Sequence, residues 1–379
     1  MLNHKIKNIT LFFSYGVSIK TWAKTGLLQR EVKLYQELIK RHGVQVQFLT
    51  YGDAIDKKWE AALNGITLLP VYERLRRPSN KILSFIQTLF IPWIFRHELR
   101  QADLLKTNQV WGGWVAVIVK WILRKPLIVR CGYEYYDFCR KQGRSRAHLF
   151  LVFWLSKFVY VNATRIHIAT HSDKVLIQNE FKVLPSKIDV RPNWIDSNTF
   201  TPLSLSLCNR ILFVGQLNNQ KNLSLLLRSL ETTMIGLDVI GDGELRKKLY
   251  NIAQELKVDA KFFESITNDK MPEVYNRYPI YVLCSRYEGN PKTILEAMSC
   301  GLAVIGTDVP GIRDIISDGE NGLLVPEDSS ALRKAIQNLL ANESLRQKLG
   351  TNARKTILNN NSMEHAIAKE YAVYQQLAK

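Results

Sequence analysis

Two glutamates, Glu288 and Glu296, lie eight positions apart around the expected start of a helix. The segment follows an apolar run at 280–283, Pro291 suits the first position of a helix, and Gly301 suits its end. Backbone N–H groups at a helix start favour a bound phosphate, and a carboxylate on each side could accept hydrogen bonds from sugar or ribose hydroxyls that flank it. The candidate contacts at this helix start are Gly289, Asn290, Lys292 and Thr293.

Two glycine turns in the same half of the chain add further candidates. An apolar run at 210–214 leads into Gly215 and Gln216, and Lys221 follows, where its ammonium group could meet phosphate as a mobile point charge. A second turn contains Gly241-Asp242-Gly243. Each of these signals is weak alone, because surface lysines, loop carboxylates and Gly-x-Gly turns are common. Their order and spacing together indicate a ligand site.

Short apolar runs alternate with helical patterns along the chain, which is typical of parallel sheets covered by helices on both faces. A turn-rich segment at 191–202 separates the two halves. We therefore expect two doubly wound domains with the carboxyl ends of their strands facing an interdomain cleft. The strand-like runs are 6–13, 44–49, 127–129, 165–169, 210–214, 237–240, 280–283 and 303–306.

The combination resembles family 4 glycosyltransferases, retaining enzymes of the GT-B fold, whose E-x7-E element corresponds here to Glu288 and Glu296. The resemblance covers most of residues 190–355 and is loose in the N-terminal half. It implies an α/β fold of two Rossmann-like domains, the first at 1–195 for the acceptor and the second at 196–355 for the nucleotide sugar. A helical tail at 356–379 would pack back on the first. The matching segments are 192–196, 213–221, 241–243, 307–311 and 318–325.

The resemblance also assigns roles. Glu288 and Lys221 are the implied catalytic residues, one on the donor sugar hydroxyls and the other on the donor diphosphate, while Glu296 holds the ribose. Two positions depart from the family: Gln216 replaces a basic residue, which weakens charge stabilisation of the leaving group, and Glu264 stands where glycine is usual.

The N-terminal half lacks the cleft histidine that several family members carry after a strand. At that place the chain has Arg130, a candidate electrophilic contact, and Glu134, a candidate acceptor base. A plain loop explains both equally well. Gly16 lies in an early turn that could line the diphosphate.

The implied reaction is transfer of a sugar from a nucleoside-diphosphate sugar to a hydroxyl of a glycan or lipid-linked acceptor, as in polysaccharide biosynthesis. The sugar nucleotide is a co-substrate, and we expect no cofactor. We also expect no metal site, because the sequence has no His, Asp or Cys cluster at ligand spacing. Five cysteines without a C-x-x-C pair indicate a reducing, cytoplasmic setting.

Positive charge is concentrated in the N-terminal half. Residues 1–200 hold 31 Lys and Arg against 14 Asp and Glu, whereas residues 201–379 hold 21 against 20. Basic and aromatic residues are interleaved at 73–105, a mixture suited to a membrane interface, although a solvated face or ordinary helix cores give the same pattern. We expect a cytoplasmic enzyme that is peripheral on the inner face of the plasma membrane and binds a lipid-linked or otherwise anionic acceptor.

Three alternatives remain open from the sequence. One is a nucleotide-sugar-binding protein of the same fold without transferase activity. Another is a Rossmann oxidoreductase using Gly241-Asp242-Gly243, which is weaker because Arg246 and Lys247 stand around the place of the third glycine. The last is a basic nucleic-acid-binding module, which is disfavoured because no recognisable reading motif is present, so we expect no nucleic-acid partner.

Overall fold

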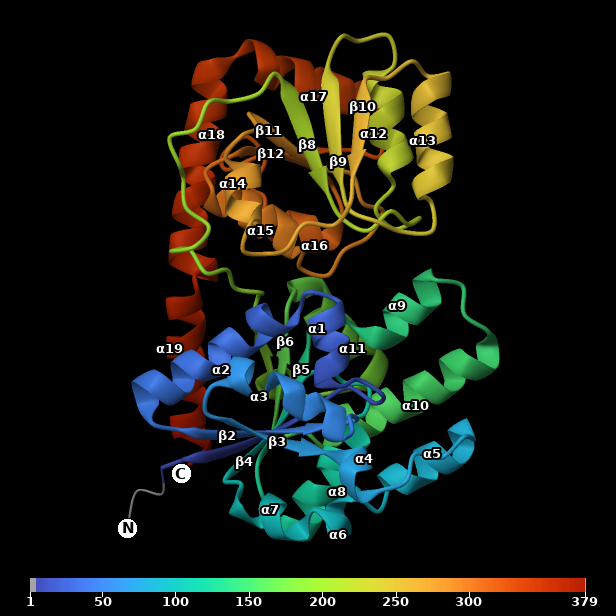
Figure 1. Cartoon of the computed structure of the whole chain (residues 1–379), viewed down its shortest axis with the longest axis vertical. Coiled ribbons are helices and arrows are strands. Elements are labelled where there is room, and N and C mark those ends of the chain that lie inside the picture. Colours follow the sequence, from blue (N-terminus) through green and yellow to red (C-terminus); the bar gives the residue numbers. More distant parts are fainter. Residues whose placement is uncertain (1–4, 379) are drawn as a thin grey trace. The chain divides into compact units, whose positions relative to one another are not determined.

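The computed structural model describes residues 5–378 and separates the chain into two compact units (Figure 1). The N-terminal unit comprises Met1–Arg191 together with Ile367–Lys379, and the C-terminal unit comprises Pro192–Ala366. The sequence placed these divisions at 195–196 and 355–356. Residues 1–4 and 379 of the predicted outer segments lie outside the described residues.

The N-terminal unit is built on a seven-stranded parallel sheet in the order β3-β2-β1-β4-β5-β6-β7. The chain moves outward from β1 to β3 on one side and then crosses to β4 on the other side of β1. Its strands are β1 (Asn8–Phe12), β2 (Gln45–Thr50), β3 (Ile66–Pro70), β4 (Leu104–Thr107), β5 (Leu127–Cys131), β6 (Arg165–Ile168) and β7 (Ile188–Val190).

Helices and 3₁₀ turns connect these strands, and their apolar faces form a core with the sheet, as in Leu38, Trp114 and Ile177. Helices α2, α8 and α11 pack against the strands, and α10 packs on α8, α9 and α11. The elements are α1 (Ile19–Lys24), α2 (Leu28–His42), η1 (Ala54–Trp59), α3 (Glu60–Leu63), α4 (Val71–Arg74), α5 (Lys81–Thr88), α6 (Ile91–Ile94), α7 (Arg96–Gln101), α8 (Gly113–Leu123), α9 (Tyr135–Lys141), α10 (Arg146–Asn162), α11 (His171–Phe181) and η2 (Pro185–Lys187).

The C-terminal unit has a six-stranded parallel sheet in the order β10-β9-β8-β11-β12-β13, with its own apolar core. Its strands are β8 (Arg210–Val214), β9 (Gly236–Ile240), β10 (Ala260–Phe263), β11 (Ile280–Leu283), β12 (Ala303–Thr307) and β13 (Leu323–Val325). Its helices are α12 (Leu223–Leu230), α13 (Arg246–Glu255), α14 (Met271–Tyr275), α15 (Lys292–Ser299), α16 (Pro310–Arg313), α17 (Ser329–Ala341), α18 (Glu343–Thr356) and η3 (Ile357–Asn361), followed by α19 (Met363–Leu377).

Three strands of the N-terminal unit carry no clear apolar signal in the sequence. β3 ends in a proline, β7 has only three residues, and β4 contains Lys106 in a four-residue strand. Lys106 is 1% exposed. A buried lysine in a central strand is costly unless a charge partner reaches it, so this strand depends on a contact from elsewhere in the chain.

That partner comes from the C-terminal helix α19. The Lys106 ammonium lies 2.5 Å from Oε1 of Glu370, and His167 on β6 lies 3.5 Å from Oε2 of the same carboxylate. Burial alone would raise the pKa of Glu370, but the charges of Lys106 and His167 outweigh it and hold that pKa well below its usual range. At the C-terminal end of α2, the ring of His42 stacks on the ring of Tyr371 of α19, with the ring centroids 3.7 Å apart. These contacts attach residues 370 and 371 to the first sheet.

Within residues 5–378, every helix is too short or too polar to cross a lipid bilayer.

The Lys106–Glu370 pair predicts a specific loss of stability. Lys106→Met should lower the free energy of unfolding of the N-terminal unit by about 3–5 kcal/mol, because it leaves a buried carboxylate without its ammonium partner. Urea titration followed by tryptophan fluorescence can measure this, since seven of the eight tryptophans belong to this unit. Combining Lys106→Met with Glu370→Met should recover most of the loss. Equal destabilisation in the single and double variants would contradict a role for charge pairing.

Candidate active site

The C-terminal sheet changes direction between β8 and β11. From β8 the chain moves through β9 to β10 on one side, and β11 then pairs with the other side of β8. In open α/β sheets, ligands bind outside the carboxyl ends of the strands at such a switch point. The loop after β8 carries Lys221 and the loop after β11 carries Glu288, so the two residues predicted from the sequence flank this point.

Close backbone contacts hold the glycine turns in place. Gly241 has φ +142°, and a Cβ there would lie 2.0 Å from the carbonyl oxygen of Gly215. A Cβ at Gly243 would lie 2.4 Å from the carbonyl oxygen of Leu217. Backbone hydrogen bonds from Gly215 N to Ile240 O and from Leu217 N to Asp242 O join the same turns. These glycines therefore permit an approach that any side chain would block.

Lys221 and Glu288 form the centre of the candidate site. The Lys221 ammonium lies 2.5 Å from Oε1 of Glu288, and the Ser285 hydroxyl donates to the same oxygen at 2.6 Å. The amide of Gln220 donates to the carbonyl of Tyr287 at 3.0 Å, and Arg286 N donates to the carbonyl of Gln220 at 2.9 Å. The loop after β8 and the loop after β11 are thus joined by backbone and side-chain contacts.

Glu296 lies deeper than Glu288, one turn inside α15. It is 4% exposed, and its Oε2 accepts a hydrogen bond from the hydroxyl of Tyr275 at 2.9 Å. Burial, together with the nearby Glu296 carboxylate, raises the pKa of Tyr275 well above its ordinary value, so the phenol stays protonated and able to donate. Asn268 donates to Oε1 at 3.3 Å. A ribose hydroxyl that binds Glu296 would join or replace these donors.

The start of α15 is tied to the segment that opens the C-terminal unit. Asn193 donates from its backbone to Oδ1 of Asn290 at 2.8 Å and from its side chain to the Asn290 carbonyl at 2.6 Å. The Lys292 ammonium lies 5.5 Å from the ring centroid of Trp194, and Thr293 hydrogen-bonds to buried Tyr281. The side chains of Asn290, Lys292 and Thr293 therefore position this helix start. The contacts predicted between these residues and a ligand involve their backbone N–H groups instead.

Other predicted donor contacts lie at the edges of this centre. The Gln216 side chain is exposed and meets Asn218 at 3.4 Å, so it does not join the Lys221–Glu288 pair. Gly215 faces Lys221, whose Cε would lie 3.7 Å from an added Cβ. On the opposite side, a Cβ at Gly311 would lie 1.8 Å from the carbonyl oxygen of Gly289, so α16 packs directly on the loop that carries Glu288.

In the N-terminal unit, Gly16 follows β1 at the corresponding switch point between β1 and β4. It has φ +80°, and the space around it is open. The backbone of Tyr15 donates to the carbonyl of Trp111 after β4. The helix start beside this turn is already occupied, because the buried Asp56 carboxylate accepts from the backbone of Ile19 and Lys20 at 3.0 Å. A phosphate at Gly16 would therefore meet the turn and not the α1 N-terminus.

The structure buries Glu134, which the sequence offered as an acceptor base. Its carboxylate caps α9 by accepting from Asp137 N at 2.7 Å and lies 3.3 Å from the Tyr160 hydroxyl. Burial raises the pKa of Glu134 to about 7. The side chain is 1% exposed and serves as the N-cap of α9, and its role as an acceptor base stays a prediction. Arg130, on β5, is half-buried and lies near enough to Lys106 to affect its pKa.

Sequence reasoning missed several neighbours of the predicted residues. Ser285 comes just after β11, and its position at a strand end was an available signal. Gln220 directly precedes the predicted Lys221, and this adjacency in the sequence was an available signal. Tyr275 is 21 positions from Glu296, and only the fold brings the two together.

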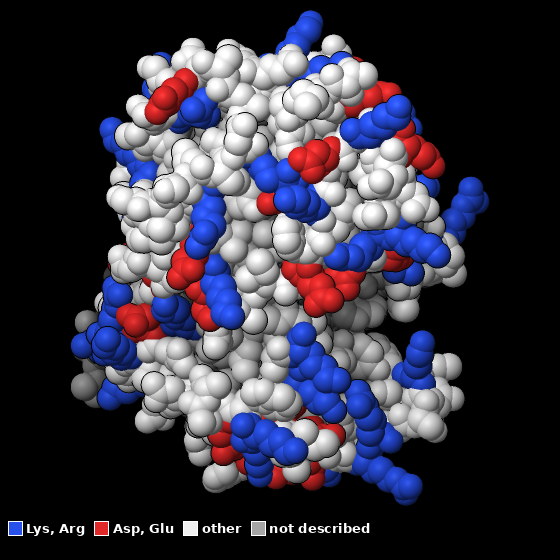
Figure 2. Space-filling view, turned by 45° about the horizontal axis from the view of Figure 1, so that its top comes forward, with Lys and Arg blue, Asp and Glu red and all other residues white. Residues whose placement is uncertain are grey.

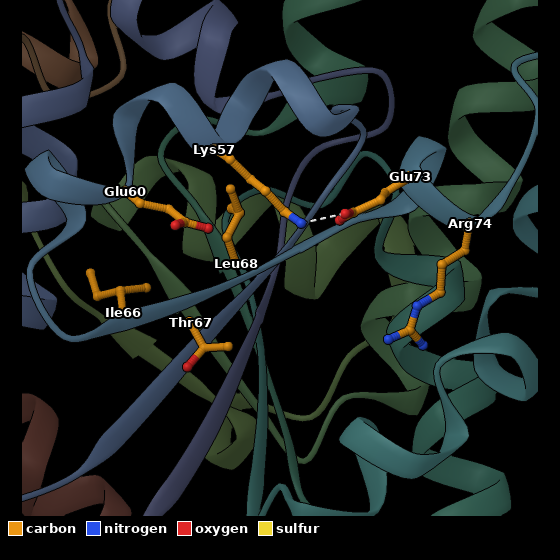
Figure 3. Close-up of a pocket in the computed structure, with 7 residues that line it drawn as sticks. All are labelled: Lys57, Glu60, Ile66, Thr67, Leu68, Glu73 and Arg74. Carbon is orange, nitrogen blue, oxygen red and sulfur yellow. Dashed lines mark hydrogen bonds and ion pairs between the residues drawn. The ribbon is translucent and has the colours of Figure 1, made fainter.

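A separate hollow of about 590 Å³ opens beside the edge strand β3. Figure 3 shows Lys57 and Glu73 pointing toward one another across it and joined as an ion pair, with Arg74 at one side. Arg74 is paired with Glu98. Because these charges neutralise one another, the hollow shows no excess charge for an anionic ligand. Among the described residues, no three His, Cys, Asp or Glu side chains gather in a way that could hold a metal ion.

The chain is similar in sequence to several known proteins. Residues 208–356 match the family model described as Glycosyl transferases group 1. An uncharacterized glycosyltransferase of Methanocaldococcus jannaschii is 32% identical over 171 residues, covering 44% of this chain and 48% of the relative. The N-acetylgalactosamine-N,N'-diacetylbacillosaminyl-diphospho-undecaprenol 4-alpha-N-acetylgalactosaminyltransferase of Campylobacter jejuni is 29% identical over 188 residues, covering 47% and 51%. The chain spans about half the length of these relatives.

The fold is shared over nearly the whole chain. The Anabaena protein HepE, solved with UDP and glucose, superposes with a TM-score of 0.76 and covers 98% of this chain and 100% of that one, at 16% sequence identity. The predicted α/β architecture of two Rossmann-like domains, with the GT-B fold, is confirmed.

The close contact between Gly241 and Gly215 predicts that a side chain at position 241 disrupts these turns. Gly241→Ala should strongly reduce hydrogen-exchange protection across 211–243. The new Cβ would collide with a backbone carbonyl, and the alanine would have to adopt an unfavourable φ. Gly319→Ala is the matched control, since Gly319 also has a positive φ, +71°, but nothing lies within 4 Å of its added Cβ. Hydrogen exchange measured by mass spectrometry should show local opening around the altered residue that is clearly larger for Gly241→Ala. Similar effects in both variants would mean that backbone conformation alone, and not the close approach, requires glycine.

Proposed function

We propose that this protein is a retaining glycosyltransferase that moves a sugar from a nucleoside-diphosphate sugar to a hydroxyl of a glycan or lipid-linked acceptor. The observation that carries the proposal is the Lys221–Glu288 pair, seated at the β8/β11 switch point of a domain that matches the group 1 family. A cation and a carboxylate at one such edge suit a ligand that combines phosphates with hydroxyl groups.

In the proposed donor complex, different groups of the C-terminal unit bind different parts of the nucleotide sugar. Lys221 moves from Glu288 toward the diphosphate, and the backbone N–H groups at the start of α15 add positive potential. Glu288 is then available to accept hydrogen bonds from the transferred sugar, while Glu296 accepts from the ribose. The Lys221 side chain is 17% exposed, beside the 6% exposed carboxylate of Glu288.

The chemical step that we propose breaks the bond between the anomeric carbon and the diphosphate oxygen, and the acceptor hydroxyl forms the new bond on the same face. The proton of that hydroxyl passes to the departing phosphate, which acts as the base. Lys221 stabilises the charge that develops on the leaving group. Gln216 adds no charge there, so Lys221 and the helix start carry this task.

The acceptor is the broadest part of the proposal. The Campylobacter relative is named for a diphospho-undecaprenol acceptor, and an Escherichia coli relative, 26% identical over 243 residues, is named as an α-1,3-galactosyltransferase acting on GlcNAc-diphosphoundecaprenol. The basic N-terminal half is compatible with such an anionic, lipid-linked acceptor. We therefore propose that the enzyme works as a peripheral protein on the cytoplasmic side of a membrane.

The role of Lys221 predicts a loss that is specific for phosphate. Lys221→Ala should weaken binding of the nucleoside diphosphate by about tenfold or more and leave binding of the corresponding nucleoside almost unchanged, because its proposed partner is the diphosphate. Isothermal titration calorimetry measures both, after a thermal-shift panel has identified the nucleoside diphosphate that stabilises the protein best. Lys247→Ala, an exposed lysine in the same unit, is the matched control. Equal losses for nucleotide and nucleoside would show that Lys221 does not bind the phosphates, and stabilisation by NAD or FAD alone would favour an oxidoreductase.

The two glutamates should separate in kinetics. Glu288→Gln should lower kcat by about 10²-fold or more with little change in nucleotide affinity, because its hydrogen bonds to the sugar strengthen in the transition state. Glu296→Ala should mainly weaken nucleotide binding. Initial rates with the identified donor, combined with calorimetry, measure the two effects. Wild-type kinetics in both variants would sink these assignments, and donor binding without any transfer would favour the nucleotide-sugar-binding alternative.

A further inference from the structure

A group of large apolar side chains lies exposed on helices of the N-terminal unit. They lie on α5, on α6 and just before it, near the end of α8, and on α10, and each is at least half exposed by relative surface area. Among them are Ile82, Phe90, Trp93, Trp121, Phe150 and Trp154, with exposures of 69%, 57%, 57%, 55%, 68% and 50%. We call this set, with the basic residues around it, the basic aromatic face. Large exposed apolar groups in such number mark an interaction surface.

Contacts within the unit link the helices that carry this face. Phe85 of α5 packs on Trp114 of α8 at a ring distance of 5.2 Å, and Trp121 of α8 packs on Phe158 of α10 at 5.4 Å. In Figure 1, α5 and the hairpin formed by α9 and α10 extend on the same side of this unit. The inner aromatic residues thus fix the helices, while their neighbours on the same helices stay exposed. Only the α5–α6 part was predicted from the sequence, at 73–105.

Positive charge predominates around these side chains. Residues 74–162 contain 16 Lys and Arg but only four Asp and Glu. None of those four acidic residues is exposed: Glu134 and Asp137 are buried, and Glu98 and Asp103 are half-buried. The exposed basic residues include Arg76, Lys81, Arg144 and Arg146, and Figure 2 shows a run of Lys and Arg side chains on this unit.

We propose that the basic aromatic face docks on an anionic lipid bilayer, with the aromatic side chains entering the interfacial region and the Lys and Arg side chains binding lipid phosphates. Tryptophan is favoured at membrane interfaces, and basic residues near an anionic surface add attraction that salt screens. A second copy of this chain is a poor occupant, because two faces with the same excess of positive charge would repel one another. The proposal makes the α9–α10 hairpin a second arm beside α5–α6, and it holds whether or not the protein transfers sugars.

Lys157 shows how charge and aromatic surface are combined on α10. Its ammonium lies 5.1 Å from the ring centroid of Trp154 and 5.9 Å from that of Phe153. Phe150 packs edge-on against Trp154 at 6.2 Å. An aromatic group and a cation held together on one exposed helix face suit the boundary between acyl chains and phosphates.

Flotation of the full chain with liposomes tests the proposal. We expect binding to vesicles of phosphatidylcholine with 30% phosphatidylglycerol at low salt, release at high salt, and little binding to pure phosphatidylcholine. Arg144→Glu with Arg146→Glu should lower the partition coefficient by about tenfold or more, since each basic residue at the surface contributes roughly fivefold. Lys247→Glu with Lys248→Glu makes the same change of charge at exposed positions in the C-terminal unit and should bind as the wild type does.

A second pair of variants isolates the aromatic part. Phe150→Ser with Trp154→Ser should also lower binding, whereas Leu207→Ser with Met234→Ser, at exposed apolar positions in the C-terminal unit, should not. Brominated lipids should quench the tryptophan fluorescence of the wild type, which shows insertion and not only electrostatic attachment. Circular dichroism and thermal unfolding verify that the variants fold.

Three results would overturn the proposal: no binding to anionic vesicles, binding that ignores lipid charge and salt, or equal loss in the C-terminal control variants. Sedimentation gives the remaining outcome. A concentration-dependent dimer that Phe150→Ser with Trp154→Ser disrupts, without vesicle binding, would identify a second copy as the occupant. Because vesicle binding needs no donor or acceptor, its failure is distinguishable from a failure of the transferase assignment.

Discussion

The candidate site depends on the close approach of backbone segments in the C-terminal unit. Turns after β8 and β9 touch through Gly215 and Gly241, and α16 touches the loop after β11 through Gly311 and Gly289. These contacts leave no volume for a Cβ, so they fix the loops that carry Lys221 and Glu288 on either side of the sheet's switch point. Main-chain packing thus fixes the geometry of the candidate site, and the charged side chains are held on a closely packed frame.

The ion pair at the centre has a second consequence. Without ligand, the ammonium of Lys221 and the carboxylate of Glu288 compensate one another, which lowers the cost of keeping both partly buried. In the proposed donor complex, a diphosphate would compete for the lysine, and a sugar hydroxyl would then offer the carboxylate a new partner. Each part of the proposed donor would replace one half of the pair. In the N-terminal unit, by contrast, the Asp56 carboxylate already fills the start of α1, so that helix end is satisfied internally.

How much the sequence could predict differs between the two units. In the C-terminal unit, β8, β9, β11 and β12 are largely apolar runs, and glycine follows β8 and β9, so these strands could be located and Glu288 placed before its helix. In the N-terminal unit, β4 is hard to recognise in the sequence because Lys106 interrupts its apolar pattern. The buried lysine pairs with Glu370, which lies 264 positions away. Glu134 illustrates the same limit, since its position after a strand suggested chemistry while burial makes it a helix cap. Partners distant along the chain, such as Tyr275 for Glu296, leave no local pattern.

The contact between Lys106 and Glu370 bears on the order in which the chain folds as it is made. Translation delivers residues 192–366 completely before Glu370 emerges, so all of the C-terminal unit is available while the first sheet still contains a lysine without its counter-charge. The N-terminal unit, although synthesised first, can reach its final arrangement only when the last helix arrives. If translation stopped before residue 370, the C-terminal unit of the released chain could complete its core. The N-terminal unit would lack the carboxylate that pairs with Lys106.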